Sequence, residues 1–129
     1  MVEKIVLDTN FLLIPARFKV DIFSELRRVL DVNYSLCIPD LCLAELRKIS
    51  AGKGKAAREA KLGLQLVRQK GISILKTGRK GHTDDVILEL AEKERFITAT
   101  QDLRFAKRLS YKGLSVIFFT NKGSLEFSG

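Results

Sequence analysis

Cysteine is scarce in this sequence, and its scarcity excludes two classes of small protein. Only Cys37 and Cys42 occur among the 129 residues, and both lie in one apolar neighbourhood. Two thiols cannot form a disulfide framework, and no second pair of cysteines or histidines completes a zinc site. We interpret both cysteines as small buried hydrophobic residues of a protein in a reducing cytosol.

Long apolar runs and an N-terminal targeting segment are also lacking. No apolar stretch approaches the roughly 20 residues that cross a bilayer. Charge appears already at Glu3 and Lys4, which is unlike a signal peptide. The sequence therefore predicts a cytoplasmic protein that does not associate with membranes. Its length suits one core, so we expect a single domain over residues 1–129.

Positive charge is in excess. The sequence has 23 lysines and arginines against 15 aspartates and glutamates, a formal net charge of +8. This balance favours a polyanionic partner, most commonly nucleic acid, although a solvated lysine-rich surface has the same composition. No aromatic-rich stretch is present, so recognition of bases by stacking is not indicated.

Short apolar runs alternate with helical patterns along the chain. We expect strands at 5–7, 36–38, 72–75, 96–99 and 115–119, and helices over 20–30, 41–50, 55–69, 83–94 and 102–109. Pro15 is expected to mark a break, and Asp40 and Thr83 are expected to cap helices. Fully apolar strands between helices predict a three-layer α/β/α fold with a central parallel sheet of about five strands. The tail after residue 119 leaves room for a short edge strand.

Acidic residues follow four of these strands. Asp8 closes the first strand, Glu45 lies in the helix after the second, Asp84 and Asp85 open the helix after the third, and Asp102 follows the fourth. Because parallel strands end at the same edge of a sheet, we expect these acids to converge in one cleft. Converging carboxylates repel each other, and one or two Mg²⁺ or Mn²⁺ ions would relieve that repulsion. Such ions activate water for phosphodiester hydrolysis.

Each acid also has an ordinary structural interpretation. Asp8 could cap a turn, Asp102 could cap a helix, and Glu45 could be a solvated helix residue. One of Asp84 and Asp85 could simply favour the helix dipole in a first turn. Only the joint placement of the acids favours a metal site.

The sequence contains four stretches that together resemble the PIN-domain nuclease family: LDTNFLL, PDLCLAELRKI, TDDVILELAEK and FITATQDLRFAKRL. They occur in the family's order and cover nearly the whole chain. The resemblance implies a sheet order of 3-2-1-4-5. It also implies an Mg²⁺- or Mn²⁺-dependent endoribonuclease that leaves a 5′-phosphate and a 3′-hydroxyl. The catalytic and metal-binding residues it implies are Asp8, Glu45, Asp84 and Asp102, with Asp85 as a substitute for Asp84 and with Asn10 and Thr100 as accessory polar residues.

Two branches of the family are considered. The stretches ELRKISAGKGKAAREAKLGLQLV, TDDVIL and QDLRFAKRL look more like the small-subunit processome proteins that cut precursor ribosomal RNA than like VapC-type toxins. The first branch implies RNA, and pre-rRNA in particular, as the partner, and the second adds an antitoxin. Many members of the family form homodimers. A non-catalytic RNA-binding module for ribosome assembly is a further alternative. A phospho-receiver domain is disfavoured because the third strand ends in Lys76-Thr77-Gly78, with no aspartate.

Basic residues adjoin the acids in sequence. Cations around a cluster of metal-binding acids suit RNA, because they hold backbone phosphates while metal ions act on the scissile one. Any single lysine or arginine could instead be merely solvated. The predicted RNA-binding residues are Lys48, Lys53, Lys55, Arg58, Arg79, Lys80 and Arg104.

Overall fold

A six-stranded sheet forms the centre of the computed structural model, which describes residues 2–120 and 122–129. Its strands are β1 (Glu3–Leu7), β2 (Tyr34–Pro39), β3 (Ser73–Leu75), β4 (Ile97–Thr100), β5 (Val116–Phe119) and β6 (Leu125–Ser128), in the order β3-β2-β1-β4-β5-β6. The first five pair in parallel and β6 pairs antiparallel with β5. The expected order is therefore confirmed, and the tail supplies the edge strand.

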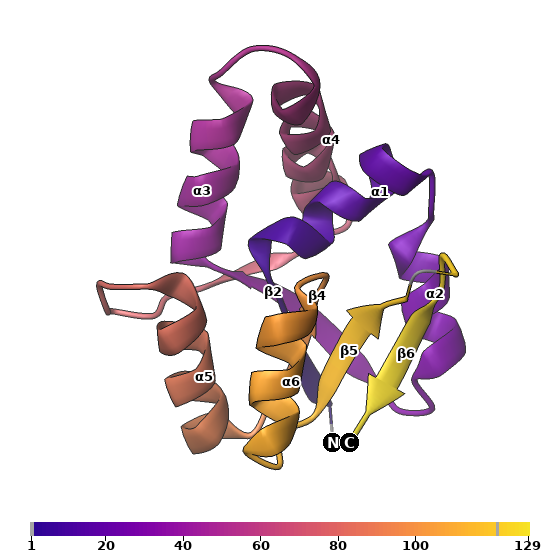
Figure 1. The fold of residues 1–129 in the computed structure, drawn as a ribbon, viewed down its shortest axis with the longest axis vertical. Coiled ribbons are helices and arrows are strands. Elements are labelled where there is room, and N and C mark those ends of the chain that lie inside the picture. The colour runs from indigo at the N-terminus through magenta and orange to yellow at the C-terminus, as the bar shows by residue number, and fades with distance from the viewer. Residues whose placement is uncertain (1, 121) are drawn as a thin grey trace.

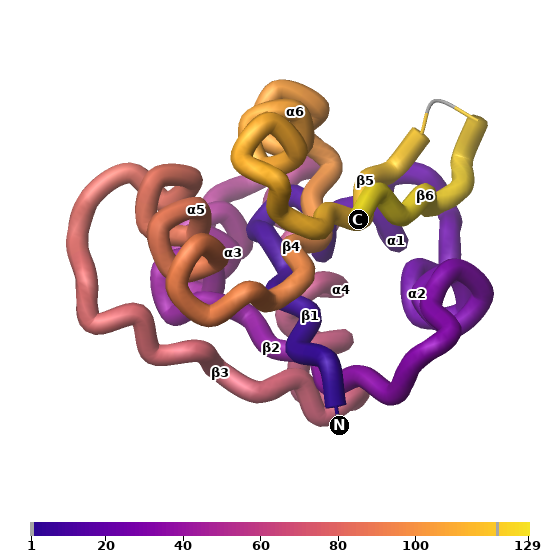
Figure 2. Tube along the Cα trace, turned by 90° about the horizontal axis from the view of Figure 1, so that it is seen from below, coloured from indigo at the N-terminus to yellow at the C-terminus, as the bar shows by residue number. Residues whose placement is uncertain are grey.

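Helices cover both faces of the sheet and its carboxyl edge. The α-helices are α1 (Ile14–Phe18), α2 (Ile22–Val29), α3 (Asp40–Ser50), α4 (Lys55–Gln69), α5 (Thr83–Glu94) and α6 (Leu103–Tyr111), and η1 (Thr9–Leu13) is a 3-10 helix. Figure 2 shows α5 and α6 on one side of the sheet and α2 on the other. In Figure 1, α1, α3 and α4 lie above the ends of the strands. None of the helices in the described ranges is long and apolar enough to cross a membrane.

Burial of the central strands explains their apolar composition. Ile5, Val6 and Leu7 of β1 have no exposed surface, and the residues of β4 are buried throughout. These parts of β1 and β4 are covered on both faces, which favours apolar residues in them. The polar side chains that follow β1 and β4 therefore lie together at the carboxyl edge of the sheet, where the buried parts of these strands end.

Three expectations about helix starts are wrong. Pro15 does not break the chain but lies in the first turn of α1, where its missing N–H costs no hydrogen bond. Asp40 is not a cap; it lies inside α3 and accepts hydrogen bonds from the backbone N–H and hydroxyl of Thr77. Thr83 is not a cap either, because its hydroxyl donates to Glu45. In all three cases a tertiary contact or a tolerated position outweighs the local preference.

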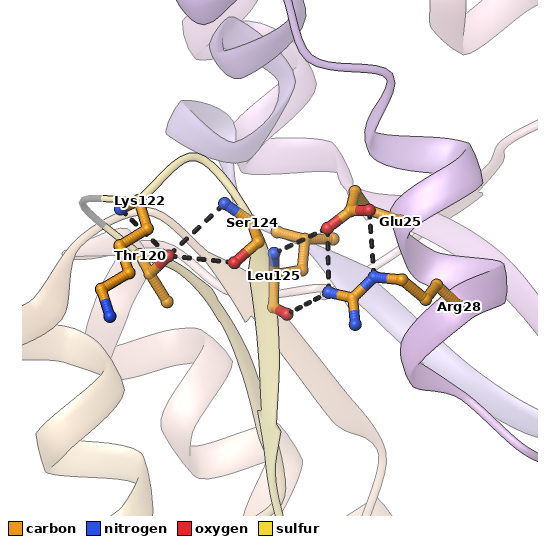
Figure 3. A network of polar contacts seen from close by, with 6 residues as sticks. All are labelled: Glu25, Arg28, Thr120, Lys122, Ser124 and Leu125. Atoms are coloured by element: carbon orange, nitrogen blue, oxygen red, sulfur yellow. Dashed lines mark hydrogen bonds and ion pairs between the residues drawn. The ribbon is translucent and has the colours of Figure 1, made fainter.

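The edge strand β6 is fastened to α2 by a small polar network (Figure 3). Arg28 donates to the Glu25 carboxylate at 3.0 and 3.1 Å and to the carbonyl of Leu125 at 2.9 Å. The Leu125 N–H in turn donates to Glu25 at 3.1 Å. Thr120 and Ser124 shape the turn before β6, since the Ser124 N–H donates to the Thr120 hydroxyl. Side chains of α2 thus satisfy backbone groups at the start of an edge strand.

A glycine lets α4 pack directly on η1, the element that follows β1. A Cβ on Gly63 would lie 2.9 Å from the carbonyl oxygen of Leu12. We expect Gly63→Ala to lower the free energy of unfolding by about 1–3 kcal/mol, because the backbones must separate. Urea unfolding of both proteins measures this. Helix propensity alone predicts the opposite, a gain of about 1 kcal/mol, so a stabilised variant would contradict the close contact.

Candidate active site

Asp8 lies at the point where β1 ends and the core opens. Its carboxylate is only 4% exposed. One oxygen accepts a hydrogen bond from the Thr9 N–H at 2.8 Å and the other accepts from the Thr100 hydroxyl at 2.9 Å. Its own N–H donates to the carbonyl of Ala99 at 2.9 Å, which ties the end of β1 to β4. Asp8 does cap η1, as the structural alternative expected, but the same side chain also lines a pocket.

Thr100 and Asn10 join the chain segments on either side of Asp8. The Thr100 hydroxyl, which donates to Asp8, also accepts from the N–H of Asp102 at 3.1 Å. The Asn10 carbonyl oxygen accepts from the N–H of Gln101 at 2.9 Å. These contacts hold the turn after β4 against the turn after β1. The two residues expected to be accessory therefore lie beside Asp8.

Glu45 links three elements through its carboxylate. It projects from α3, and its two oxygens accept hydrogen bonds from the hydroxyls of Thr9 at 3.2 Å and of Thr83. The roles of these two threonines were missed in the sequence. Thr9 is adjacent to Asp8, which was the available signal, whereas nothing local distinguished Thr83 from an ordinary cap.

The two neighbouring aspartates at the start of α5 face different surroundings. Asp84 is partly buried and lines the pocket with Asp8 and Glu45. Asp85 points away, is 60% exposed and forms an ion pair with Arg108 at 2.5 Å. We name this cavity of about 520 Å³ the acidic pocket; its lining is Asp8, Thr9, Asn10, Leu13, Glu45, Ile49, Gly81, His82, Thr83 and Asp84.

Asp102 lies beside the acidic pocket rather than in its lining. It is the N-cap of α6, and one of its oxygens accepts from the N–H groups of Arg104 at 2.9 Å and Phe105 at 3.3 Å. Its charge nevertheless acts on Asp84, whose pKa it helps to raise. Asp102 therefore does cap a helix, through one of its carboxylate oxygens. It is also close enough to Asp84 for its charge to act on that residue.

The acids perturb one another's ionisation. Burial raises the pKa of Asp8 to about 6, hydrogen bonds from Thr100 and Thr9 oppose the rise, and the charges of Asp84 and Glu45 add to it. The pKa of Asp84 is raised by burial first and then by the charge of Asp102. Residues far apart in the sequence thus form one cluster that is short of positive charge.

The donor atoms of the acidic pocket fit a hard divalent cation. Its carboxylates and hydroxyls supply oxygen donors, His82 adds one imidazole, and no lysine or arginine of the described residues lines it. Within the same residues, no three Asp, Glu, His or Cys side chains are already close enough to hold an ion. The acids therefore surround the pocket without forming a closed cage. Mg²⁺ is usually held by one or two carboxylates and keeps several waters, which matches such a set.

Most residues of the predicted RNA-binding set are exposed. Arg79 is the exception, because it pairs with Glu89 of α5 at 2.5 Å. The exposed members are Lys48, Lys53, Lys55, Arg58, Lys80 and Arg104. These cations lie on the surface of α3, α4 and α6 and in the loops before α4 and α5, outside the acidic pocket.

Comparisons with known proteins agree with this geometry. The family model described as a PIN-like domain matches residues 5–122. Ribonuclease VapC4 of Methanocaldococcus jannaschii is 27% identical over 128 residues, covering 98% of this chain and 97% of the relative. The structure of the PIN domain endonuclease Utp24 superposes with a TM-score of 0.79 at 23% identity, over 97% of this chain and 90% of that one. VapBC2 from Rickettsia felis bound to a promoter DNA fragment has a TM-score of 0.65 at 16% identity, over 91% and 99%. At these identities the two structures show the fold alone.

The raised pKa of Asp8 predicts a pH-dependent stability. The folded protein binds the Asp8 proton more tightly than the unfolded chain, so stability falls as pH rises from about 4 to about 6 and stays lower above that. Asp8→Asn cannot ionise. In EDTA we expect it to be more stable than the natural protein at pH 8, by up to about 3 kcal/mol, with the difference vanishing near pH 4.

Urea unfolding at both pH values measures this difference. The charge-matched control is Asp85→Asn, which removes an exposed carboxylate. If Asp8→Asn were less stable than the natural protein at pH 8, desolvation of the carboxylate would not be the dominant effect.

Proposed function

The chain belongs to the PIN-like domain family, and from that premise we propose that it is a divalent-metal-dependent endoribonuclease. One observation supports the proposal above others. The carboxylates of Asp8, Glu45 and Asp84 come from three separate elements and line one pocket that contains no lysine or arginine among the described residues. A folding core gains nothing from such a cluster, because each added charge raises the cost of ionising the others.

Mg²⁺ or Mn²⁺, as one or two ions, would be held by Asp8, Glu45, Asp84 and Asp102. When bound, the cation supplies Lewis acidity and a water that ionises more readily, as phosphodiester hydrolysis requires. The chain itself provides orientation. Thr100 holds one oxygen of Asp8, and the hydroxyls of two threonines hold both oxygens of Glu45.

RNA would be attracted by the net charge of +8 and held through its backbone. The RNA-binding set defined above supplies the contacts, with Arg79 free to act only if it leaves Glu89. Contacts to phosphates position a strand without reading its sequence. The cut site would therefore be selected by RNA shape or by a partner rather than by base stacking.

RNA processing, with precursor ribosomal RNA as the substrate, is the role we propose. Its support is the fold likeness to Utp24, which extends over 97% of this chain. The second candidate is a toxin ribonuclease with an antitoxin partner. Its support is the 27% identity to VapC4 over nearly the full length of both chains.

Neighbouring aspartates offer a matched test of the site. We expect Asp84→Asn to lower Mn²⁺-dependent cleavage of structured RNA at least about 100-fold, because a metal ligand matters no less than the groups that orient it. Asp85→Asn should change the rate less than about fivefold, since an exposed ion pair is worth at most about 1 kcal/mol. Gel analysis of cut RNA with and without EDTA measures both. Equal losses in the two variants would place the ligand elsewhere.

RNA captured in cells distinguishes the two roles. We expect RNAs crosslinked to the Asp84→Asn protein to be enriched in precursor ribosomal RNA. We also expect induction of the natural protein to leave growth unchanged. Growth arrest that Asp84→Asn abolishes would favour the toxin. Crosslinking to rRNA precursors without metal-dependent cleavage would instead identify a non-catalytic assembly module.

A further inference from the structure

We propose that Lys19, Lys55 and Arg58 form a second binding site, which holds a backbone phosphate of the RNA outside the acidic pocket. The proposal rests on the RNA-binding function proposed above, because it concerns how the same substrate is held. Two of these cations belong to the predicted RNA-binding set. Lys19 does not, and its position joins them into a defined pocket.

The site lies between α1 and the first turns of α4, which pack against each other (Figure 1). Here a second cavity of about 430 Å³ is lined by the three cations together with Pro15, Glu59 and Leu62. Lys19 comes from the end of α1, and the other two cations come from α4. Helices distant in the sequence thus bring three positive side chains to one cavity.

The one acid in this cavity is already paired. Glu59 is 5% exposed, and its carboxylate accepts hydrogen bonds from Arg17 at 3.0 and 3.3 Å. The Arg17 guanidinium holds the pKa of Glu59 below its usual value. Within the described part of the chain, Lys19, Lys55 and Arg58 form no ion pair within 4.0 Å. Three exposed cations therefore share a cavity whose one acid is already bound by Arg17, which leaves an excess of positive charge for an anion.

The backbone of Lys19 gives an independent observation. This residue is the C-cap of α1 with φ 57° and ψ 40°, the left-handed region, and its N–H donates to the carbonyl of Pro15 at 3.1 Å. Glycine is the residue that such a position favours. The residue in this position is nevertheless a lysine, and it lines the cavity.

The acidic pocket and the cavity that contains the three cations are lined by neighbouring residues of one chain segment. Leu13 lines the acidic pocket, and Pro15 lines the cationic one. Leu13 and Lys19 are six residues apart, about 9 Å at the 1.5 Å rise of a helix, a length that neighbouring backbone phosphates of one extended strand can cover. A continuing strand can therefore occupy both pockets. A lone phosphate is a poorer ligand, because exposed lysines and arginines are solvated and screened by salt.

Arg95 makes a matched control possible. It is the C-cap of α5 with φ 59° and ψ 34°, and like Lys19 it is an exposed cation in the left-handed region. Lys19→Gly and Arg95→Gly therefore remove the same charge and relieve the same backbone strain. Arg95 is about 16 Å along α5 from Asp84, at the opposite end of that helix.

The experiment measures binding of the full chain to a 12-nucleotide fluorescein-labelled single-stranded RNA in EDTA. Fluorescence anisotropy at several salt concentrations gives the affinity and its salt dependence. At 0.1 M salt we expect Lys19→Gly to weaken binding about three- to tenfold and to lower the salt slope by about 0.7. Arg95→Gly should change neither, and both variants should melt at or above the temperature of the natural protein.

Equal affinities for the two glycine variants, or a salt slope that Lys19→Gly leaves unchanged, would overturn the site. A different result would show that the proposed nuclease function is wrong while the second binding site is right. RNA would remain uncut in Mn²⁺ while the Lys19→Gly binding defect persisted.

Discussion

Burial of a carboxylate at the end of a central strand is the constraint on which the site depends. Asp8 follows three residues with no exposed surface, and it is tolerated there only because Thr9 and Thr100 donate to its two oxygens. The second donor comes from β4, so the site requires β1 and β4 to be neighbours. The strand order is thus a condition of the chemistry as well as of the packing.

The acids whose pKa values are raised gather at one place in this protein. Acids occupy the pocket at the carboxyl edge of the sheet, where burial and mutual repulsion raise the pKa values of Asp8 and Asp84. Cations stay on the surface, and the one acid of the cationic cavity, Glu59, is paired by Arg17. Although the chain has a net charge of +8, no lysine or arginine among its described residues lines that pocket.

The sequence predicts the fold well for the elements that are fully buried. A short, fully apolar run such as the one that ends at Leu7 is typical of a strand buried on both faces. The gathering of Asp8, Glu45 and Asp84 was also predictable, since it follows from where parallel strands end. The preference for Asp84 over Asp85 came from the resemblance to the family and not from the pattern of apolar residues, because adjacent residues in a first turn differ only in which neighbours they meet. The threonine contacts to Glu45 were missed for the same reason, since they depend on segments distant in the sequence. The helix containing Pro15 was missed because a proline in a first helical turn has the same local signal as a proline that ends an element.

The attachment of β6 to α2 has a consequence for self-association. An edge strand ordinarily offers a template on which a second chain can add a strand, and this leads to swapped dimers or fibres. Here Arg28 and Glu25 already engage both backbone groups of Leu125. That end of β6 is therefore closed to an incoming strand, which leaves β3, at the opposite edge of the sheet, as the more open template for such an addition.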